Sequence, residues 1–218
     1  MKILEPPQSG SVAGQTSSRN RFGQYKRTRA IPVNPASSAQ GIVRARMAGN
    51  AAAWRLLTAA QRAGWADLGL SMTRSDSLGQ SYNLQGNQAY ASVNNIRLLC
   101  GLAAVSDAPA IATPVALQTV DITLAAATLS IAYTVTPLAA ANYLLVFASP
   151  QRSAGRNYEG DFRFIKASAA AGASPLVALT EYTAKFGVPI SGQKIFFSLV
   201  TATLGFESGP FLIGQAVT

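Results

Sequence analysis

Glu159 and Asp161 are the closest pair of carboxylates in the sequence, and paired carboxylates are the groups that glycosidases use. Because they are two positions apart, both would point to the same face of an extended strand. They lie in a turn-like stretch before a predicted strand, where carboxylate pairs are usually solvated. We therefore expect them to be surface groups rather than an acid–base pair.

Other residue types that carry out chemistry are scarce. Cys100 is the only cysteine, and the chain contains no histidine. This composition excludes an internal disulfide, a Ser-His-Asp or Cys-His nucleophile and a histidine-ligated metal centre. Cys100 falls in the last turn of a predicted helix, where we expect a small buried apolar side chain. We expect no enzymatic activity, no cofactor, no metal and no small-molecule substrate.

Positive charge is concentrated in the first half of the chain. Residues 1–100 hold twelve Lys and Arg against three Asp and Glu, whereas residues 101–218 hold six of each. Between Glu5 and Asp67 there are nine basic residues and no acidic one. Such a segment repels itself in isolation and is stabilised by an acidic partner, either nucleic acid, an anionic membrane or an acidic protein surface.

Residues 1–36 are rich in Gly, Pro, Ser and Thr and show no helical or alternating apolar pattern. We expect an extended arm that a partner orders, because so little apolar area cannot offset the entropy of ordering. An unstructured, solvated tail is the alternative. The predicted partner-binding residues combine two aromatic and five basic side chains: Arg19, Arg21, Phe22, Tyr25, Lys26, Arg27 and Arg29. Aromatic side chains among arginines suit hydrophobic pockets on a protein or stacking on bases.

Residues 37–101 are predicted to be a helical region. Ser37 or Ser38 can cap a first helix, whose apolar face would hold Val43, Met47, Trp54 and Leu57. Thr58 and Gln61 match a capping box that begins a second helix, toward Leu68. We expect Trp54 and Trp65 to meet across this helical hairpin in a small packed core, rather than to stack on nucleic acid.

A third helix is predicted from Gly86, with an apolar stripe of Tyr90, Val93 and Ile96, and Gly101 is placed to end it. Residues 102–116 contain prolines that interrupt any regular element, so they read as a linker.

Residues 117–218 show apolar residues with a period of two, which is typical of strands. Seven strands are predicted: 117–124, 128–135, 143–149, 162–167, 176–182, 194–201 and 211–217. Seven short strands in about 100 residues favour an immunoglobulin-like or fibronectin-like β-sandwich. The Cys and Trp hallmarks of antibody domains are missing, which favours the fibronectin-like variant. The predicted class is α+β: a basic arm (1–36), a helical region (37–101), a linker (102–116) and a sandwich (117–218).

Phosphate-binding loops, zinc-finger spacings and a clear helix-turn-helix are absent from the sequence. No apolar run approaches the roughly 18 residues of a membrane helix, and we expect no membrane partner. The first ten residues have too short an apolar stretch for a secretory signal, so we expect no targeting segment.

Several segments together resemble proteins encoded by tailed bacteriophages and prophages. The resemblance covers roughly residues 10–100 and depends on the basic run 19–35, with Asn34-Pro35, and on 54–65 with both tryptophans; 84–90 and Asn94-Asn95 complete it. In the predicted sandwich, 148–150, 153–155 and 182–187 look like the companion domain of the same proteins.

The resemblance implies a structural component of the virion, assembled in the bacterial host cytoplasm. We expect a capsid decoration (cement) protein that contacts the major capsid or tail proteins of the particle and forms a homo-oligomer. A tail or head-to-tail connector component is the alternative, and a nucleic-acid-binding virion protein is a second. Recognition of the host surface through loops of the sandwich also stays open.

Overall fold

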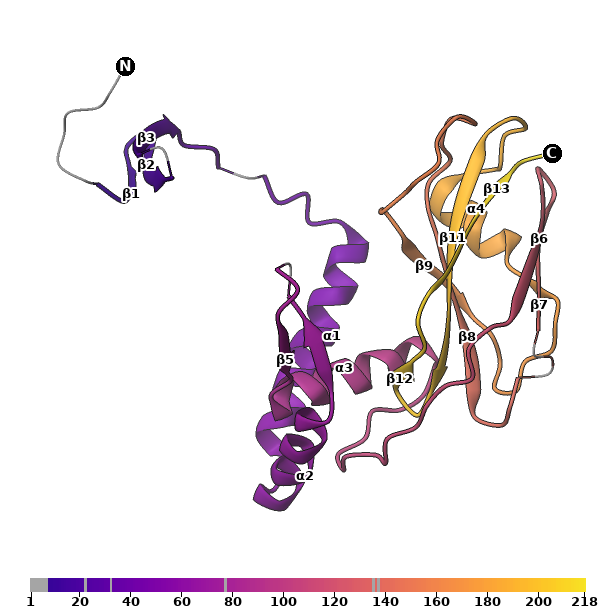
Figure 1. Ribbon diagram of the computed structural model, residues 1–218, viewed down its shortest axis with the longest axis horizontal. Coiled ribbons are helices and arrows are strands. Elements are labelled where there is room, and N and C mark those ends of the chain that lie inside the picture. The colour runs from indigo at the N-terminus through magenta and orange to yellow at the C-terminus, as the bar shows by residue number, and fades with distance from the viewer. Residues whose placement is uncertain (1–7, 22, 32, 77, 135, 137) are drawn as a thin grey trace. The chain divides into compact units, whose positions relative to one another are not determined.

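The computed structural model describes residues 8–218 apart from 22, 32, 77, 135 and 137, and its chain divides into two compact units, residues 1–43 and 44–218. Each unit is described by itself. Their described residues form four helices and several antiparallel sheets, in agreement with the predicted α+β class (Figure 1).

The first unit contains a three-stranded antiparallel sheet of β1 (Gly10–Val12), β2 (Gln15–Asn20) and β3 (Gly23–Thr28). A two-residue turn at Ala13-Gly14 joins β1 to β2, and Ala13 has a φ of 51°. The expectation of an arm without regular structure is therefore wrong for residues 10–28. The strands escaped prediction because they lack the apolar alternation that marks a half-buried strand.

Helix α1 (Ser38–Leu56) begins where the sequence predicts, and the Ser37 hydroxyl accepts a hydrogen bond from the Gln40 N–H at 3.4 Å. The predicted apolar face of this helix is only partly correct. Leu57, just after the helix, is buried and Trp54 is half-buried, but Val43 and Met47 are 59% and 49% exposed. The face is therefore covered only toward the C-terminal end of the helix.

Helix α2 (Ala59–Leu70) carries the predicted capping box, in which the Thr58 hydroxyl accepts from the Gln61 N–H and the Gln61 side chain accepts from the Thr58 N–H. A hairpin of β4 (Thr73–Ser75) and β5 (Ser81–Asn83) leads to α3 (Gly86–Leu99). The helix ends before Gly101, whose φ of 76° favours glycine. The three helices predicted for this stretch are therefore present, with the β4–β5 hairpin between the second and the third.

The core of the helical part forms around Tyr90 of α3. Its ring contacts those of Trp54 (centroids 5.6 Å apart) and Trp65 (5.1 Å). Trp65 is fully buried, and its Nε1–H donates to the Ser106 carbonyl at 2.7 Å. Both tryptophans thus pack in one small core, as predicted, with Tyr90 as their shared neighbour.

Residues 102–116 contain no helix or strand, as predicted, and they contact the helices. Asn94, which is fully buried, exchanges two hydrogen bonds with the backbone of Val105, at 2.8 and 3.2 Å. Asp107 accepts from the Gln61 side chain at 3.1 Å. Residues 44–218 form one compact unit, and the finer domain boundaries stay a prediction.

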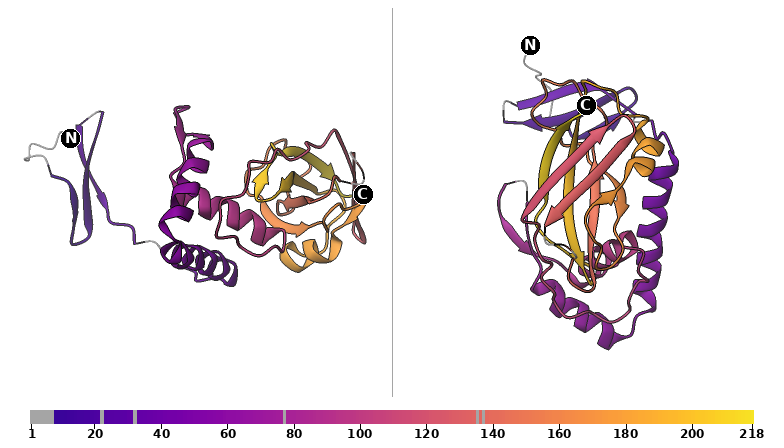
Figure 2. Two further views of the ribbon diagram at one scale, coloured as in Figure 1. Left: turned by 90° about the horizontal axis from the view of Figure 1, so that it is seen from below. Right: turned by 90° about the vertical axis from the view of Figure 1, so that its right-hand side faces the viewer.

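Two antiparallel sheets make up the remainder of the second unit. One has the order β10 (Leu176–Val177), β7 (Thr128–Thr134), β6 (Thr119–Ala125). In the other, β11 (Lys194–Thr203) pairs with β8 (Asn142–Ala148), β12 (Phe206–Glu207) and β13 (Phe211–Ala216), and β9 (Arg163–Ala167) pairs with β8. The right-hand view of Figure 2 shows β6 and β7 in front of the larger sheet.

Apolar side chains from both sheets fill one core between them. Ile131 of β7, Leu144 of β8 and Phe197 of β11 are all fully buried in it. On the opposite face of the larger sheet, Val200 and Leu145 pack against Ile96 of α3. The sheet is thus covered on both faces, once by the smaller sheet and once by the helical part.

One of the seven predicted strands is largely wrong. Residues 176–182 form only the two-residue β10, followed by helix α4 (Leu179–Phe186). Leu179, Tyr182 and Phe186 recur at the spacing of a helical face, and the Tyr182 and Phe186 rings lie 5.1 Å apart. Residues 179–186 therefore follow the apolar spacing of a helix and not the alternation of a strand.

Candidate functional site

The predicted partner-binding residues lie on different faces of the N-terminal sheet. Residues that face each other across an antiparallel pair have side chains on the same face. Arg19 pairs with Gln24, and Ser17 pairs with Lys26, so Arg19 and Lys26 share one face.

Tyr25 and Arg27 lie on the other face of the sheet. Their cross-strand partners in β2 are Ser18 and Thr16, respectively. Arg29 follows β3, and its N–H donates to the Gly14 carbonyl at 2.8 Å, which prolongs the strand pairing by one bond. Arg21 lies in the β2–β3 turn, and Phe22 is outside the described residues. The sheet therefore presents basic residues on both faces, and Tyr25 accompanies only one group of them.

The described part of residues 1–43 contains no buried side chain. Val12 is 82% exposed and Tyr25 is 37% exposed. A small sheet normally needs an apolar face packed on another layer for independent stability. Backbone hydrogen bonds, rather than apolar burial within the described segment, therefore make up this sheet.

Glu159 and Asp161 belong to an ion-pair cluster, in which Asp161 is exposed, as expected, and Glu159 is not. Glu159 is buried and pairs with Arg152, and with Arg156 at 3.5 Å. Hydrogen bonds from the Asp161 N–H, opposed by burial and reinforced by Arg152 and the Gly160 N–H, lower the pKa of Glu159 to about 2. Asp161 pairs with Arg163 at 3.0 Å. A carboxylate held ionised in this way orders a loop and is unsuited to general acid catalysis.

Cys100 is half-buried next to Ile96 and Leu145. Burial raises the pKa of its thiol to about 11, with a further contribution from Glu207 opposed by Arg97. The thiol therefore stays protonated at neutral pH, as the predicted apolar role requires.

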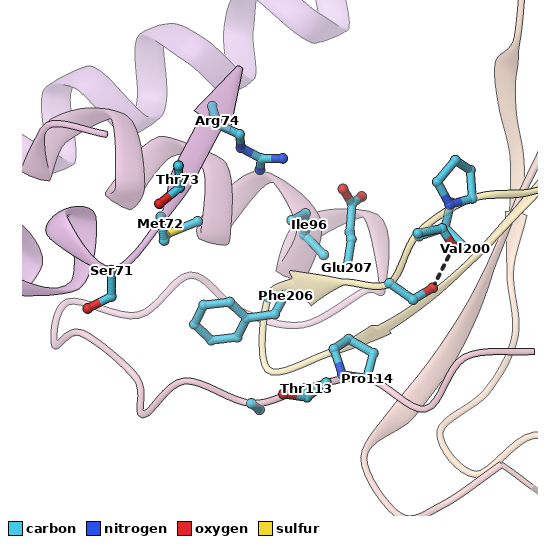
Figure 3. A pocket seen from close by; sticks show the side chains of 15 residues that line it. Ser71, Met72, Thr73, Arg74, Ile96, Thr113, Pro114, Val200, Phe206 and Glu207 are labelled. Atoms are coloured by element: carbon cyan, nitrogen blue, oxygen red, sulfur yellow. Dashed lines mark hydrogen bonds between the residues drawn. The ribbon is translucent and has the colours of Figure 1, made fainter. Parts of the chain in front are cut away.

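A cleft of about 630 Å³ lies where the β11–β12 hairpin meets β4 and residues 112–114 (Figure 3). The most buried apolar residues in its lining are Ile96, Val200 and Phe206. Figure 3 shows the charged ends of Arg74 and Glu207 on the same side of the cleft, across from Thr113 and Pro114. Desolvation raises the pKa of Glu207 and Arg74 opposes that shift.

The lining of the cleft contains one carboxylate, Glu207, and one guanidinium, Arg74, so it offers no pair of carboxylates. The sequence did not predict it, because its residues come from segments far apart in the chain. Gly205 was a local signal for the hairpin that closes the cleft, because glycine favours the positive φ that both Leu204 and Gly205 have in this turn.

Within the described parts of the chain, no group of three or more acidic, Cys or His side chains could hold a metal ion. None of the described helices has the length and apolar character required to cross a bilayer. The chain matches no protein-family model, no curated protein and no solved structure.

Proposed function

We propose that this chain is a structural component of a tailed-phage virion, a decoration or cement protein that its N-terminal unit anchors to an acidic surface of the major capsid or tail proteins. The proposal rests on the contrast between a basic unit without a buried core and a second unit with a complete one. The family resemblance of the sequence favours the virion as its location.

The observation that carries the proposal is the exposed N-terminal sheet. It presents five basic residues and one exposed tyrosine, and the described residues 8–43 include no acidic residue. A partner that packs on the sheet would supply an apolar layer and, if its surface is acidic, charge complementary to that of the sheet. An acidic protein surface with a hydrophobic pocket for Tyr25 meets both requirements.

We further propose that residues 117–218 are a fibronectin-like sandwich. If β12 is left out, the first, second and fifth strands form one sheet, and the third, fourth, sixth and seventh form the other. In the constant-type immunoglobulin arrangement, the fourth strand would belong to the first sheet instead. The module has its own apolar core, which suits a surface or subunit-interface role in a lattice, where copies also contact each other.

The test replaces all five basic residues of the N-terminal unit, Arg19, Arg21, Lys26, Arg27 and Arg29, with Gln. We expect the variant to fold and to be lost from purified particles, measured as its amount relative to the major capsid protein. Incorporation at the wild-type level would refute the anchor. The copy number of the wild-type protein separates the alternatives: a decoration protein occurs throughout the capsid lattice, and a connector or tail component is confined to few copies.

Basic residues on both faces of a sheet that carries Tyr25 also favour a second candidate, a nucleic-acid-binding virion protein. If six or more phosphates were contacted, affinity would fall by roughly three decades between low and moderate salt. Filter binding to double-stranded DNA at several salt concentrations tests this candidate, and a flat response would remove it.

A further inference from the structure

A groove between α1 and α3 lies outside both the basic sheet and the cleft of Figure 3. Its volume is about 260 Å³, and its lining includes Met47, Ala51, Trp54 and Arg55 of α1 with Asn87 and Ala91 of α3. Ligand pockets for small molecules occupy about 300–1,000 Å³, so this groove suits a side chain of a partner rather than a separate ligand.

The groove has a preformed floor. The Trp54 ring packs on Tyr90, and Gly86 allows its close approach, because a Cβ at residue 86 would lie 3.3 Å from Trp54 Cη2 and 3.0 Å from the Ala66 nitrogen. Asn50 is buried and donates to Asn95 at 3.0 Å, and Asn95 in turn donates to the Met47 sulfur at 3.5 Å. The small side chains of Ala51 and Ala91 leave the space open.

The charge of helices α1 and α3 indicates which kind of partner the groove would bind. Helices α1 and α3 carry four arginines, Arg44, Arg46, Arg55 and Arg97, and no acidic residue. Arg55 itself lines the groove. With Arg55 in its lining and no acidic residue on either helix, the groove is complementary to a helix that has an apolar anchor and acidic flanks.

A second copy of the chain is a poor complement. Among the described helices, α1 and α3 are purely basic, α2 has one acid and one base, and α4 has Glu181 with Lys185. The net charge of each copy is +9, which opposes pairing of these surfaces.

We infer that this groove docks an acidic amphipathic helix of a partner protein, with one apolar side chain of that helix between Met47, Ala51 and Trp54. The inference deepens the proposed function and rests on it for the place of the partner in the particle. It adds a second anchor, independent of the N-terminal sheet.

Site-specific photo-crosslinking in the full chain tests the inference. Met47 is replaced with a diazirine amino acid of similar size in cells that produce the particle, and the crosslinked peptide is sequenced by mass spectrometry. The control places the same amino acid at Ala52, which is exposed on α1 and does not line the groove. We expect position 47 to capture a peptide with acidic residues around apolar ones at helical spacing, and position 52 not to capture it.

Two further variants define the groove. Ala51→Phe fills the groove and should reduce the yield of the crosslink from position 47 about tenfold. The matched Ala52→Phe should leave that yield unchanged. Arg55→Gln should reduce the yield about threefold, as for one partly exposed ion pair. An unchanged yield in Ala51→Phe, or capture of a second copy, nucleic acid or a non-acidic peptide, would overturn the inference.

Failure of this inference is distinct from failure of the proposed function. If the groove captures nothing acidic but the five-Gln variant is lost from particles, only the groove is refuted. If the acidic peptide is captured but the five-Gln variant enters particles normally, the N-terminal anchor is refuted and the groove stands.

Discussion

Both units of this chain contain hydrogen-bonded strands, and they differ in how those strands are stabilised. In residues 44–218, strands and helices bury complete apolar faces, as with Phe197 between the sheets and Trp65 among the helices. In residues 1–43, three paired strands expose even their apolar side chains, such as Val12. The comparison teaches that paired strands alone leave the N-terminal sheet without a buried apolar layer among its described residues, and our proposal assigns that layer to a partner.

The largest expected effect is that of Trp65→Ala. It removes a fully buried side chain and the hydrogen bond to Ser106, so we expect the free energy of unfolding to fall by about 4 kcal/mol. Tyr25→Ala in the N-terminal sheet should change it by less than about 0.5 kcal/mol, as for an exposed position. Urea denaturation followed by circular dichroism measures both, and equal losses would contradict the comparison.

Gly205→Ala should separate the hairpin from α3. Gly205 has a φ of 100°, and a Cβ there would lie 2.5 Å from Val93 Cγ1 and 2.8 Å from the Val93 carbonyl oxygen. We expect the free energy of unfolding to fall by about 3 kcal/mol, from overpacking and backbone strain together. Gly209→Ala is the matched control, because its Cβ would meet nothing within 4 Å. A small effect at residue 205 would mean that the hairpin does not pack against α3 as described.

The stability of the second unit should depend on pH through Glu159. Its pKa lies at about 2 in the folded protein, below the ordinary value of 4.5, so its contribution is present above pH 4.5 and is lost as the pH falls toward 2. The urea midpoint of the wild type should therefore decrease over this range, and that of Glu159→Gln should decrease less. Parallel curves for the two proteins would show that Glu159 is not ion-paired in solution.

The smallest expected effect on stability is that of the five-Gln replacement of Arg19, Arg21, Lys26, Arg27 and Arg29. These residues lie in a unit with no buried side chain among its described residues, so the urea midpoint of the chain should stay within experimental error of the wild type. A clear loss of stability would show that the N-terminal sheet stabilises the rest of the chain.

Local signals in the sequence account for most of what could be predicted. The caps at Ser37 and Thr58, and Gly101 after α3, act through neighbouring residues, so the starts of α1 and α2 and the end of α3 could be predicted closely, whereas α4 was predicted as a strand. The period of two likewise predicted β6 and β7, because each has one buried face, and the apolar β8 and β11 were predicted although both of their faces are covered.

The remaining features depend on contacts between distant segments. The N-terminal strands have no apolar face to reveal them, and the burial of Glu159 depends on Arg152 and the turn that follows it. The cleft and the α1/α3 groove arise only when separate elements pack. Their residues, such as Phe206 and Ala91, have no distinguishing pattern in the sequence.

Amide hydrogen exchange of the full chain, free in solution and bound to particles, tests the central claim most directly. If the N-terminal unit lacks its packing layer, residues 10–28 should exchange rapidly in the free protein while β11 is protected, and should become protected in the particle. Protection of residues 10–28 equal to that of β11 in the free protein, or no gain of protection on particles, would contradict the claim that a partner completes this sheet.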